Sequence, residues 1–471
     1  MSDALNSPAR RSGSPFGLLT LIGLVIASMI GAGVFRTSGA LLADLPPFWI
    51  LWLWVVGGAI ALLGAVSYGG LVRQITASGG EYLFLSRAVH PLAGFLAGWI
   101  SLIAGFSGAL AFTADTLARY SNLTELLPGA AASTESSAAQ AVKWLAIAIV
   151  LLGAMLHAVR VRPGARAQTV LVLMKIVLLV GLVLAGLAAG RDQWSAGWQA
   201  AARDGWSHWL AAHDAWPCPD LTVLAMGLLS ISFAYSGFNA AVYVAGEVDH
   251  PQQRIPRAMR WGTAIVVVLY GLLNYIFVAL AAPSREADAF LAVSAFGQLV
   301  GPWAATATRV AIILALITSV SSLSLAGPRV IAQMAVDGYM PRWLAPRADA
   351  PPRAAIALQA AVAIGLLLSP IDLLSYTATL LSVSAAGTAA CLLLPALRGT
   401  PGHRPVIAWP WPPLLFAIFS LTFVGLSLLQ LWQDRSVTIR QHAQGVAIAL
   451  AFLAVGGLIY AWYRPRAAKA Q

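Results

Sequence analysis

LIGLVIASMIGAGVFRTSG, residues 21–39, is typical of a membrane-spanning helix that is interrupted near its centre, at Gly31-Ala32-Gly33. In hydrocarbon every backbone N–H and C=O needs a partner, so a broken helix is tolerated only where it faces protein or a watery cavity. The half-helix after the break presents free N–H groups and a positive dipole end to an anion such as a carboxylate. Alternatively, the glycines form a small-residue face for a neighbouring helix. This stretch alone leaves both interpretations open.

The composition of the whole chain indicates a polytopic membrane protein. Of its 471 residues, 59% are hydrophobic and only 10% are charged, and the mean hydropathy is +0.78, which is not typical of soluble globular proteins. The formal charge of +11 is better explained by arginines on cytoplasmic loops than by nucleic-acid binding. Cys218 and Cys391 fall in a predicted outer loop and in a predicted span, so no disulfide framework is expected.

Apolar runs of about 20 residues mark membrane spans, and the expected fold class is an all-α membrane protein with twelve of them. Most of the 29 Lys and Arg residues fall in loops on one side, which the positive-inside rule assigns to the cytoplasm together with both termini. The predicted spans are residues 17–43, 48–72, 91–118, 141–159, 167–190, 221–246, 258–282, 303–326, 354–369, 371–396, 411–432 and 443–463.

A second interruption falls five spans after the first. Span 6 runs LLSISFAYSGFNAAVYVAGEV, with Ser236-Gly237 near its centre. Broken helices at matching positions of two five-helix halves indicate an inverted-repeat transporter whose site lies at the bilayer midplane, which favours binding over packing. The expected divisions are a cytoplasmic tail (1–15), a ten-helix core (16–396, with repeats at 16–190 and 221–396), helices 11 and 12 (397–463) and a second cytoplasmic tail (464–471).

Five motifs share their order and spacing with one transporter superfamily. They are IGAGVF (30–35), SGGEYLF (78–84), FAYSGFN (233–239), GEVDHPQQRIPRA (246–258) and PRVIAQMAVDGYMP (328–341). Together they resemble the amino acid–polyamine–organocation superfamily, and within it the L-type amino acid transporter branch and its bacterial relatives. Gly70, Thr76 and Val336 depart from the family's usual glutamate, proline and arginine, which concerns gating rather than fold. The resemblance implies a LeuT-type 5+5 inverted repeat with broken helices 1 and 6 and two extra C-terminal helices.

By this resemblance an amino acid binds between the two breaks. Its carboxylate takes N–H groups from the first break, and its ammonium donates to carbonyls near both breaks. A side chain at Gly31 or Gly33 would block close backbone approach. The residues implied in substrate binding are Ile30, Gly31, Ala32, Gly33, Phe233, Ala234, Ser236 and Asn239.

Two of these residues carry open alternatives. Phe233 resembles the aromatic residue that closes the site from outside in this branch; the less favoured alternative is an aromatic that faces lipid or another helix. Asn239 lies just past the second break and either binds substrate or only holds the break together.

Lys175 lies deep in span 5, within VLVLMKIVLLVGLVLAG, where a charge costs at least about 2.5–3.5 kcal/mol on insertion scales. By the resemblance, its ammonium takes the place of the sodium ion that sodium-coupled members hold between span 1 and span 8. Carbonyls near Gly31 and the hydroxyl of Ser321 or Ser322 would be its partners. Alternatively the lysine reaches the membrane interface near Arg166, although nine helical residues correspond to about 13 Å. Proton coupling through Lys175 and a permanently charged structural role both stay open.

Arg36 follows the first break by less than a turn, where the family usually has an apolar or small residue. It either faces the outer vestibule and attracts a carboxylate or pairs with Asp115 near the outer end of span 3. Spans 1, 6 and 8 carry no Asp or Glu near the expected site, and Glu247 and Asp249 lie at the cytoplasmic end of span 6. A neutral amino acid is therefore favoured over a cationic one.

These features predict a sodium-independent secondary transporter of small or neutral L-amino acids in the cell inner membrane, working by alternating access through amino acid exchange. Proton-coupled symport is the first alternative, and transport of another amine or of an anionic substrate is the second. No enzymatic activity, cofactor, metal or nucleic-acid partner is expected, since the histidines are scattered and no Gly-rich lysine loop is present.

The expected partners are the amino acid substrate and the lipid bilayer. The loop of residues 121–140 lacks the cysteine with which eukaryotic L-type members bond an ancillary glycoprotein, so no disulfide-linked ancillary subunit is expected. The protein is expected to be a monomer or a weak homo-oligomer.

Overall fold

The computed structural model is helical throughout the residues that it describes, which contain no β-strand. The predicted all-α fold class is therefore confirmed for the described residues. The predicted outer loop with Cys218 and most of the loop that lacks an ancillary-subunit cysteine lie outside the described residues. These are 17–45, 47–77, 79–121, 135–159, 165–191, 219–280, 290–346, 351–370, 372–394, 397, 406–429 and 437–463.

The helices vary from single turns to membrane length, and five of the predicted spans are assembled from more than one helix. The bounds are α1 (Leu18–Met29), α2 (Gly33–Leu41), α3 (Pro47–Gln74), α4 (Glu81–Ala88), α5 (Pro91–Ile100), the π-helix η1 (Ser101–Gly108), α6 (Ala109–Tyr120), α7 (Glu135–Ala158), α8 (Ala165–Ala189), α10 (Leu221–Ala234), the 3-10 helix η4 (Ala240–Glu247), α11 (Pro251–Tyr275), the π-helix η5 (Ile276–Leu280), α12 (Leu291–Leu299), α13 (Pro302–Val336), the 3-10 helix η6 (Arg342–Leu344), α14 (Arg353–Leu368), α15 (Leu373–Ala390), the 3-10 helix η7 (Cys391–Leu393), α16 (Trp411–Leu429) and α17 (Val437–Tyr463).

Within the described ranges, ten helical stretches are long and apolar enough to cross a membrane. Two further apolar helices are shorter: α10, with 14 residues, and α14, with 16 residues. They lie where spans 6 and 9 were predicted. Sixteen helical residues rise about 24 Å, less than the roughly 30 Å of a bilayer core, and α10 is short because the chain breaks and continues as η4. The twelve-span arrangement itself stays a prediction.

Several helix ends differ from the predicted span limits, and two short helices were not predicted. α13 extends ten residues beyond the predicted span, to Val336, because the sequence after the apolar run remains compatible with helix. The short helices α4 and α12 were not predicted, since each is brief and lies directly before a long apolar run. α4 begins at Glu81, inside the SGGEYLF motif, and this residue proves important for the second break.

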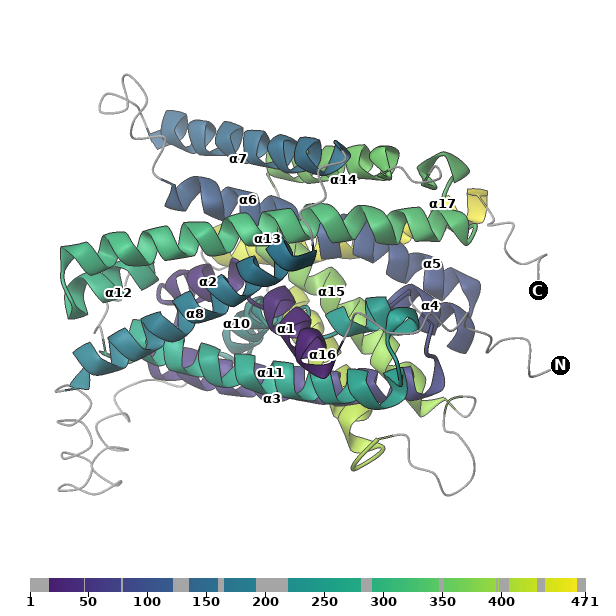
Figure 1. Ribbon diagram of the computed structural model, residues 1–471, viewed down its shortest axis with the longest axis horizontal. Helices are drawn as coiled ribbons and strands as arrows, with labels where there is room; N and C mark the ends of the chain where they lie inside the picture. Colours follow the sequence, from purple (N-terminus) through teal and green to yellow (C-terminus); the bar gives the residue numbers. More distant parts are fainter. Residues whose placement is uncertain are drawn as a thin grey trace.

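The broken helices occupy the centre of the molecule. Figure 1 shows α1, α2 and α10 between α13 on one side and α3 with α11 on the other. α1 packs on α11, and α10 packs on α3, α15 and α16. Because helical neighbours surround them, the interrupted segments are shielded from lipid, as broken backbone in a membrane requires.

Candidate substrate site at the two helix breaks

The first break separates α1 from α2 and leaves an extended residue at the end of α1. Ile30 has φ −74° and ψ 98°, and its N–H still bonds the carbonyl of Ile26 at 3.0 Å. The hydroxyl of Tyr270 on α11 donates to the carbonyl of Met29 at 2.7 Å. A side chain from a neighbouring helix therefore replaces a backbone partner that the break removes.

The N–H groups at the start of α2 are the anion donors of this site. Among the described residues, neither Ala32 nor Gly33 donates its N–H to a backbone or side-chain acceptor. The first N–H groups of a helix have no intrahelical partner and lie at the positive end of the helix dipole. A carboxylate is the kind of ligand that such a terminus suits.

The second break begins where α10 ends, at Ala234, and the chain turns sharply before η4 begins at Ala240. Gly237 in this turn has φ +94°, in the left-handed region that favours glycine. A Cβ atom on Gly237 would lie 2.7 Å from the carbonyl oxygen of Ser28 on α1. The turn of the second broken helix therefore packs directly on the first, and a larger residue would separate them.

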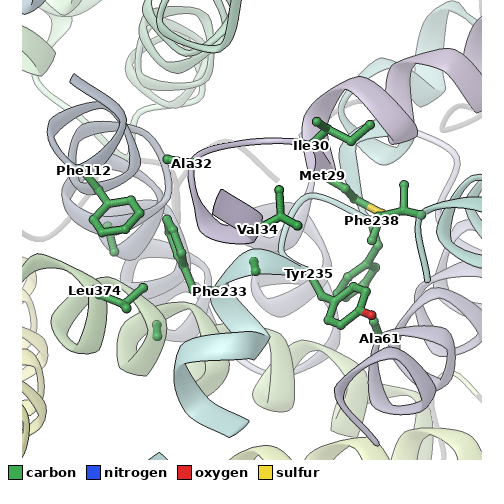
Figure 2. Packing of buried hydrophobic residues seen from close by; sticks show 14 of the residues in the cluster. Met29, Ile30, Ala32, Val34, Ala61, Phe112, Phe233, Tyr235, Phe238 and Leu374 are labelled. Atoms are coloured by element: carbon green, nitrogen blue, oxygen red, sulfur yellow. The ribbon is translucent and has the colours of Figure 1, made fainter. Parts of the chain in front are cut away.

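The two breaks meet again at Gly33 and Ala234. A Cβ atom on Gly33 would lie 2.7 Å from the Cα of Ala234, whereas a Cβ atom on Gly31 would meet no heavy atom within 4 Å. Gly33 is thus needed for helix contact, and Gly31 borders open space. Figure 2 shows Ile30 and Ala32 on the bend of the first broken helix and Phe233 close to Ala32.

The carbonyls of the second break differ in their availability. The carbonyl of Phe233 already accepts the N–H of Ser236 at 3.0 Å. Those of Ala234 and Ser236 accept no hydrogen bond from the described residues. Of the three carbonyls expected to bind an ammonium at this break, two are therefore open to a ligand and one is shared with the turn.

Phe233 contacts an aromatic partner rather than lipid. Its ring lies edge-on to that of Phe112 on α6, with the centroids 5.2 Å apart and the planes at 84°, as Figure 2 shows. Both side chains are buried. The guanidinium of Arg36 lies over the other aromatic ring, 5.0 Å from the centroid of Phe112. The guanidinium of Arg36 and the rings of Phe112 and Phe233 thus form one contact cluster beside the first break.

Arg36 pairs with Asp115, one of the two roles considered for it. Its guanidinium donates to Asp115, which also accepts from Arg119 at 3.0 Å. The side chains of Arg36 and Asp115 are 27% and 14% exposed, so the pair is partly desolvated. Asp115 is shared by Arg36 and Arg119, so it offsets only part of the charge of Arg36, and the three side chains together stay positively charged.

Lys175 reaches the first break from α8. Its side chain is buried, with 3% of the residue exposed. The ammonium donates to the carbonyl of Ile30 and, at 2.8 Å, to the hydroxyl of Ser319 on α13. A buried cation is thus held by a backbone oxygen of the break and by an oxygen from α13, rather than reaching the membrane interface.

The α13 hydroxyl that bonds this ammonium belongs to Ser319, so the prediction of Ser321 or Ser322 is corrected. Two helical residues turn by about 200°, which points Ser321 to a different face from Ser319. Ser321 instead contacts the imidazole of His157 on α7, with Nε2 and Oγ 3.2 Å apart. Ser322 lies about 4.5 Å further along the helix axis.

The profile of the amino acid permease family matches residues 16–459, which include both breaks and every residue of the site. The chain belongs to the amino acid permease family. This membership confirms the resemblance to the amino acid–polyamine–organocation superfamily and the prediction of a transporter rather than an enzyme.

Curated relatives of this permease are amino acid transporters. It is 27% identical over 290 residues to the b(0,+)-type amino acid transporter 1 of Mus musculus, covering 60% of this chain and 55% of the relative. It is 26% identical over 333 residues to the large neutral amino acids transporter small subunit 2 of Homo sapiens, covering 70% and 59%. Against the Asc-type amino acid transporter 1 of Homo sapiens it is 24% identical over 422 residues, covering 87% and 77%. The permease thus spans less than two thirds of the first two.

One part of the permease's site escaped the sequence analysis. Asn239 donates its amide N–H to Oε1 of Glu81 at 2.9 Å, so in this structure it ties the second break to α4. Glu81 belongs to a quoted motif but was given no role. The signal that marks it is an acidic residue beside apolar spans, which becomes informative only when its burial is known.

Proposed function

We propose that this permease carries neutral L-amino acids without sodium, binding them between the two helix breaks and exchanging one for another by alternating access. The observation that carries the proposal is the buried ammonium of Lys175 at the carbonyl of Ile30 and the hydroxyl of Ser319. These oxygens come from the first break and from α13, where the family resemblance locates the sodium ion of sodium-coupled members.

The ammonium accounts for sodium independence by electrostatics. An ion at this place needs oxygen ligands from both elements, and the ammonium already uses one from each. A second cation at the same oxygens would be strongly repelled, because like charges a few ångströms apart interact strongly in a poorly solvated site. Lys175 therefore supplies the positive charge that a bound sodium ion would otherwise provide.

The zwitterionic part of an amino acid matches the groups that the breaks leave open. Its carboxylate suits the N–H groups of Ala32 and Gly33, and its ammonium suits the carbonyls of Ala234 and Ser236. The open space beside Gly31 leaves room for the ligand next to the first break. Phe233 packs beside this region and would cover the substrate, as its counterpart does in the L-type branch.

A neutral side chain is favoured by the broken helices themselves, and the buried acid at the second break, Glu81, already bonds Asn239. The described residues of α1, α2 and α10 include no Asp or Glu that would pair with a cationic substrate. Arg36, which would attract an anionic one, is paired with Asp115. The proposal also includes the finer topology: twelve spans in a LeuT-type 5+5 repeat within residues 16–396, both termini in the cytoplasm, the inner membrane as location, and no disulfide-linked subunit.

The test uses purified permease in liposomes and sodium-free buffer. Uptake of labelled neutral L-amino acids is followed with and without unlabelled amino acid inside. Saturable uptake that requires internal amino acid is expected. Uptake driven by an imposed pH gradient, with no internal amino acid, would instead identify a proton symporter. If no amino acid enters under either gradient, the proposal of amino acid transport is overturned.

A further inference from the structure

A buried acid holds the second break through Asn239, and the proposed function gives this acid no role. Glu81, the first residue of α4, is only 6% exposed. Its Oε1 accepts the hydroxyl of Tyr68 on α3 at 2.7 Å and the amide of Asn239 at 2.9 Å, and its Oε2 bonds the hydroxyl of Ser384 on α15. One carboxyl group therefore joins four segments of the chain.

No basic side chain among the described residues offsets this carboxyl group. None of the ion pairs among the described residues involves Glu81. The segments packed around it contribute Tyr68 from α3, Tyr243 from η4 and Cys391 from η7 as titratable groups, while α5 and α15 contain no acidic or basic residue. An ionised carboxylate here would be buried without a counter-charge, which is strongly unfavourable.

The hydrogen bonds can also accommodate a protonated acid, although each of the three lowers the pKa of Glu81 and only burial raises it. Oε1 has two donors, the hydroxyl of Tyr68 and the amide of Asn239, as suits the carbonyl oxygen of a carboxylic acid. Oε2 has one partner, the hydroxyl of Ser384, which can accept as well as donate. A proton on Oε2 that is donated to Ser384 therefore satisfies every contact without moving a heavy atom. Burial, the largest influence, raises the pKa of Glu81, which lies between two membrane spans.

The acid lies where η4 must separate from its neighbours if the permease opens on this side. η4 carries Tyr243, whose ring lies edge-on to that of Phe106 with the centroids 6.2 Å apart, and Asn239 directly precedes its first residue. α4 makes a second link through Tyr82, whose hydroxyl donates to Asp337 at the end of α13. Movement of η4 away from α3 and α15 would break the contact between Asn239 and Glu81 and admit water to the carboxyl group.

We propose that Glu81 is a proton-binding site whose protonated form holds η4 closed, and that release of its proton to cytoplasmic water accompanies opening of the permease on that side. Once water enters, the carboxylate is hydrated and the ionised form is no longer penalised. Closing the site again requires the proton to return to Oε2. The inference deepens the proposed function, on which it rests for the direction of transport and the side that opens.

The test measures amino acid exchange in liposomes with equal pH on both sides. Wild-type, Glu81→Gln and Glu247→Gln proteins are compared; Glu247 is an exposed acid at the end of η4 and serves as the control. Glutamine imitates the protonated acid, because its amide nitrogen donates to Ser384 and its oxygen accepts from Tyr68 and Asn239. It is therefore expected to fold and to keep the closed arrangement.

While opening limits the cycle, the wild-type exchange rate is expected to rise with pH, by up to about tenfold per pH unit as long as Glu81 is mostly protonated. The rate should stop rising at the pH where return of the proton limits closing. Glu81→Gln should stay at the slow, acidic rate at every pH, and Glu247→Gln should follow the wild type. A flat wild-type profile, or a pH slope that persists in Glu81→Gln, overturns the proposal. A purely structural role would lower the rate of Glu81→Gln without removing the slope.

Thermal unfolding of the purified proteins separates this proposal from the proposed function, because it needs no transport. The folded state holds the Glu81 proton more tightly than the unfolded state, so this contribution to stability is present at acid pH and is lost as pH rises through the raised pKa. Wild-type and Glu247→Gln proteins should show this loss, and Glu81→Gln should lack it. Equal pH dependence in all three contradicts a proton at Glu81, whether or not amino acids are exchanged.

Discussion

The two helix breaks are held by opposite chemistry. At the first, a buried base from α8 bonds a backbone carbonyl, since Lys175 donates to Ile30. At the second, a buried acid from α4 bonds a side-chain amide, since Glu81 accepts from Asn239. The contact of Lys175 is with the backbone of the first break. The contact of Glu81 is with the side chain of Asn239, so it can break without a change in the backbone of the turn. From this comparison we expect the first break to keep its arrangement and the contact of the second break with Glu81 to be the one that opens.

Replacement of Lys175 should produce the largest effect on the exchange rate. Lys175→Ala deletes two charge-assisted hydrogen bonds, to Ile30 and Ser319, each contributing about 1.5–3 kcal/mol. We expect the exchange rate to fall at least about tenfold. The matched control is Lys143→Ala on α7, which should exchange at the wild-type rate. An exchange rate for Lys175→Ala equal to that of the wild type would contradict the claim that the ammonium of Lys175 supports the first break.

The glycines of the first break should separate packing from binding. Gly33→Ala puts a Cβ atom 2.7 Å from the Cα of Ala234, whereas Gly31→Ala meets nothing within 4 Å. Overpacking of this kind costs about 1–3 kcal/mol, so Gly33→Ala should lower the unfolding temperature and the exchange rate. Gly31→Ala should unfold like the wild type and weaken substrate affinity, measured as KM. Equal losses of stability in both would contradict the assigned roles.

Release of the second break should have a smaller effect. Asn239→Ala removes one hydrogen bond to Glu81, with a loss of about 1.5–3 kcal/mol if the acid is ionised and about 1 kcal/mol if it is protonated. We expect the smaller loss in chemical denaturation at acid pH. Gln253→Ala, which truncates an exposed amide on α11, should leave stability unchanged. A loss at acid pH as large as that for a charged partner would show that Glu81 is ionised.

Replacement of Arg36 should have the smallest effect on the exchange of neutral amino acids. Arg36→Ala removes a partly exposed ion pair, and Asp115 keeps its hydrogen bond with Arg119. Pairs of this kind contribute about 0–1 kcal/mol, so exchange of neutral amino acids should change by less than about fivefold. Competition by acidic amino acids is measured in parallel. If the variant loses uptake of an anionic substrate that the wild type carries, Arg36 binds substrate and the neutral preference is wrong.

Much of the fold was predictable because the bilayer restricts the chain so strongly. Long apolar runs become helices. Steps that contain glycine, Gly31-Ala32-Gly33 and Ser236-Gly237, mark where these helices break. The burial of Lys175 was also readable, since nine residues of helix separate it from the interface. These predictions depend on local sequence and on the membrane, not on how the helices pack.

The partners of the buried groups were harder to predict. Ser319, Ser321 and Ser322 are equally plausible hydroxyls in the sequence, and only the rotation of α13 selects Ser319 for Lys175. No role was predicted for Glu81, because α4 is a single short helix outside the long spans. Its three hydrogen-bond partners lie 13 to 303 residues away in the sequence, and no local sequence pattern predicts contacts over such distances.

The most direct test of the account is the cation dependence of exchange by the wild type and by Lys175→Ala. Initial rates of neutral amino acid exchange are measured in liposomes with sodium, potassium or choline on both sides. The account predicts equal wild-type rates in the three salts and low rates for the variant with potassium or choline. Wild-type exchange that requires sodium would contradict it, because the ammonium of Lys175 could not then be the cation that serves the first break.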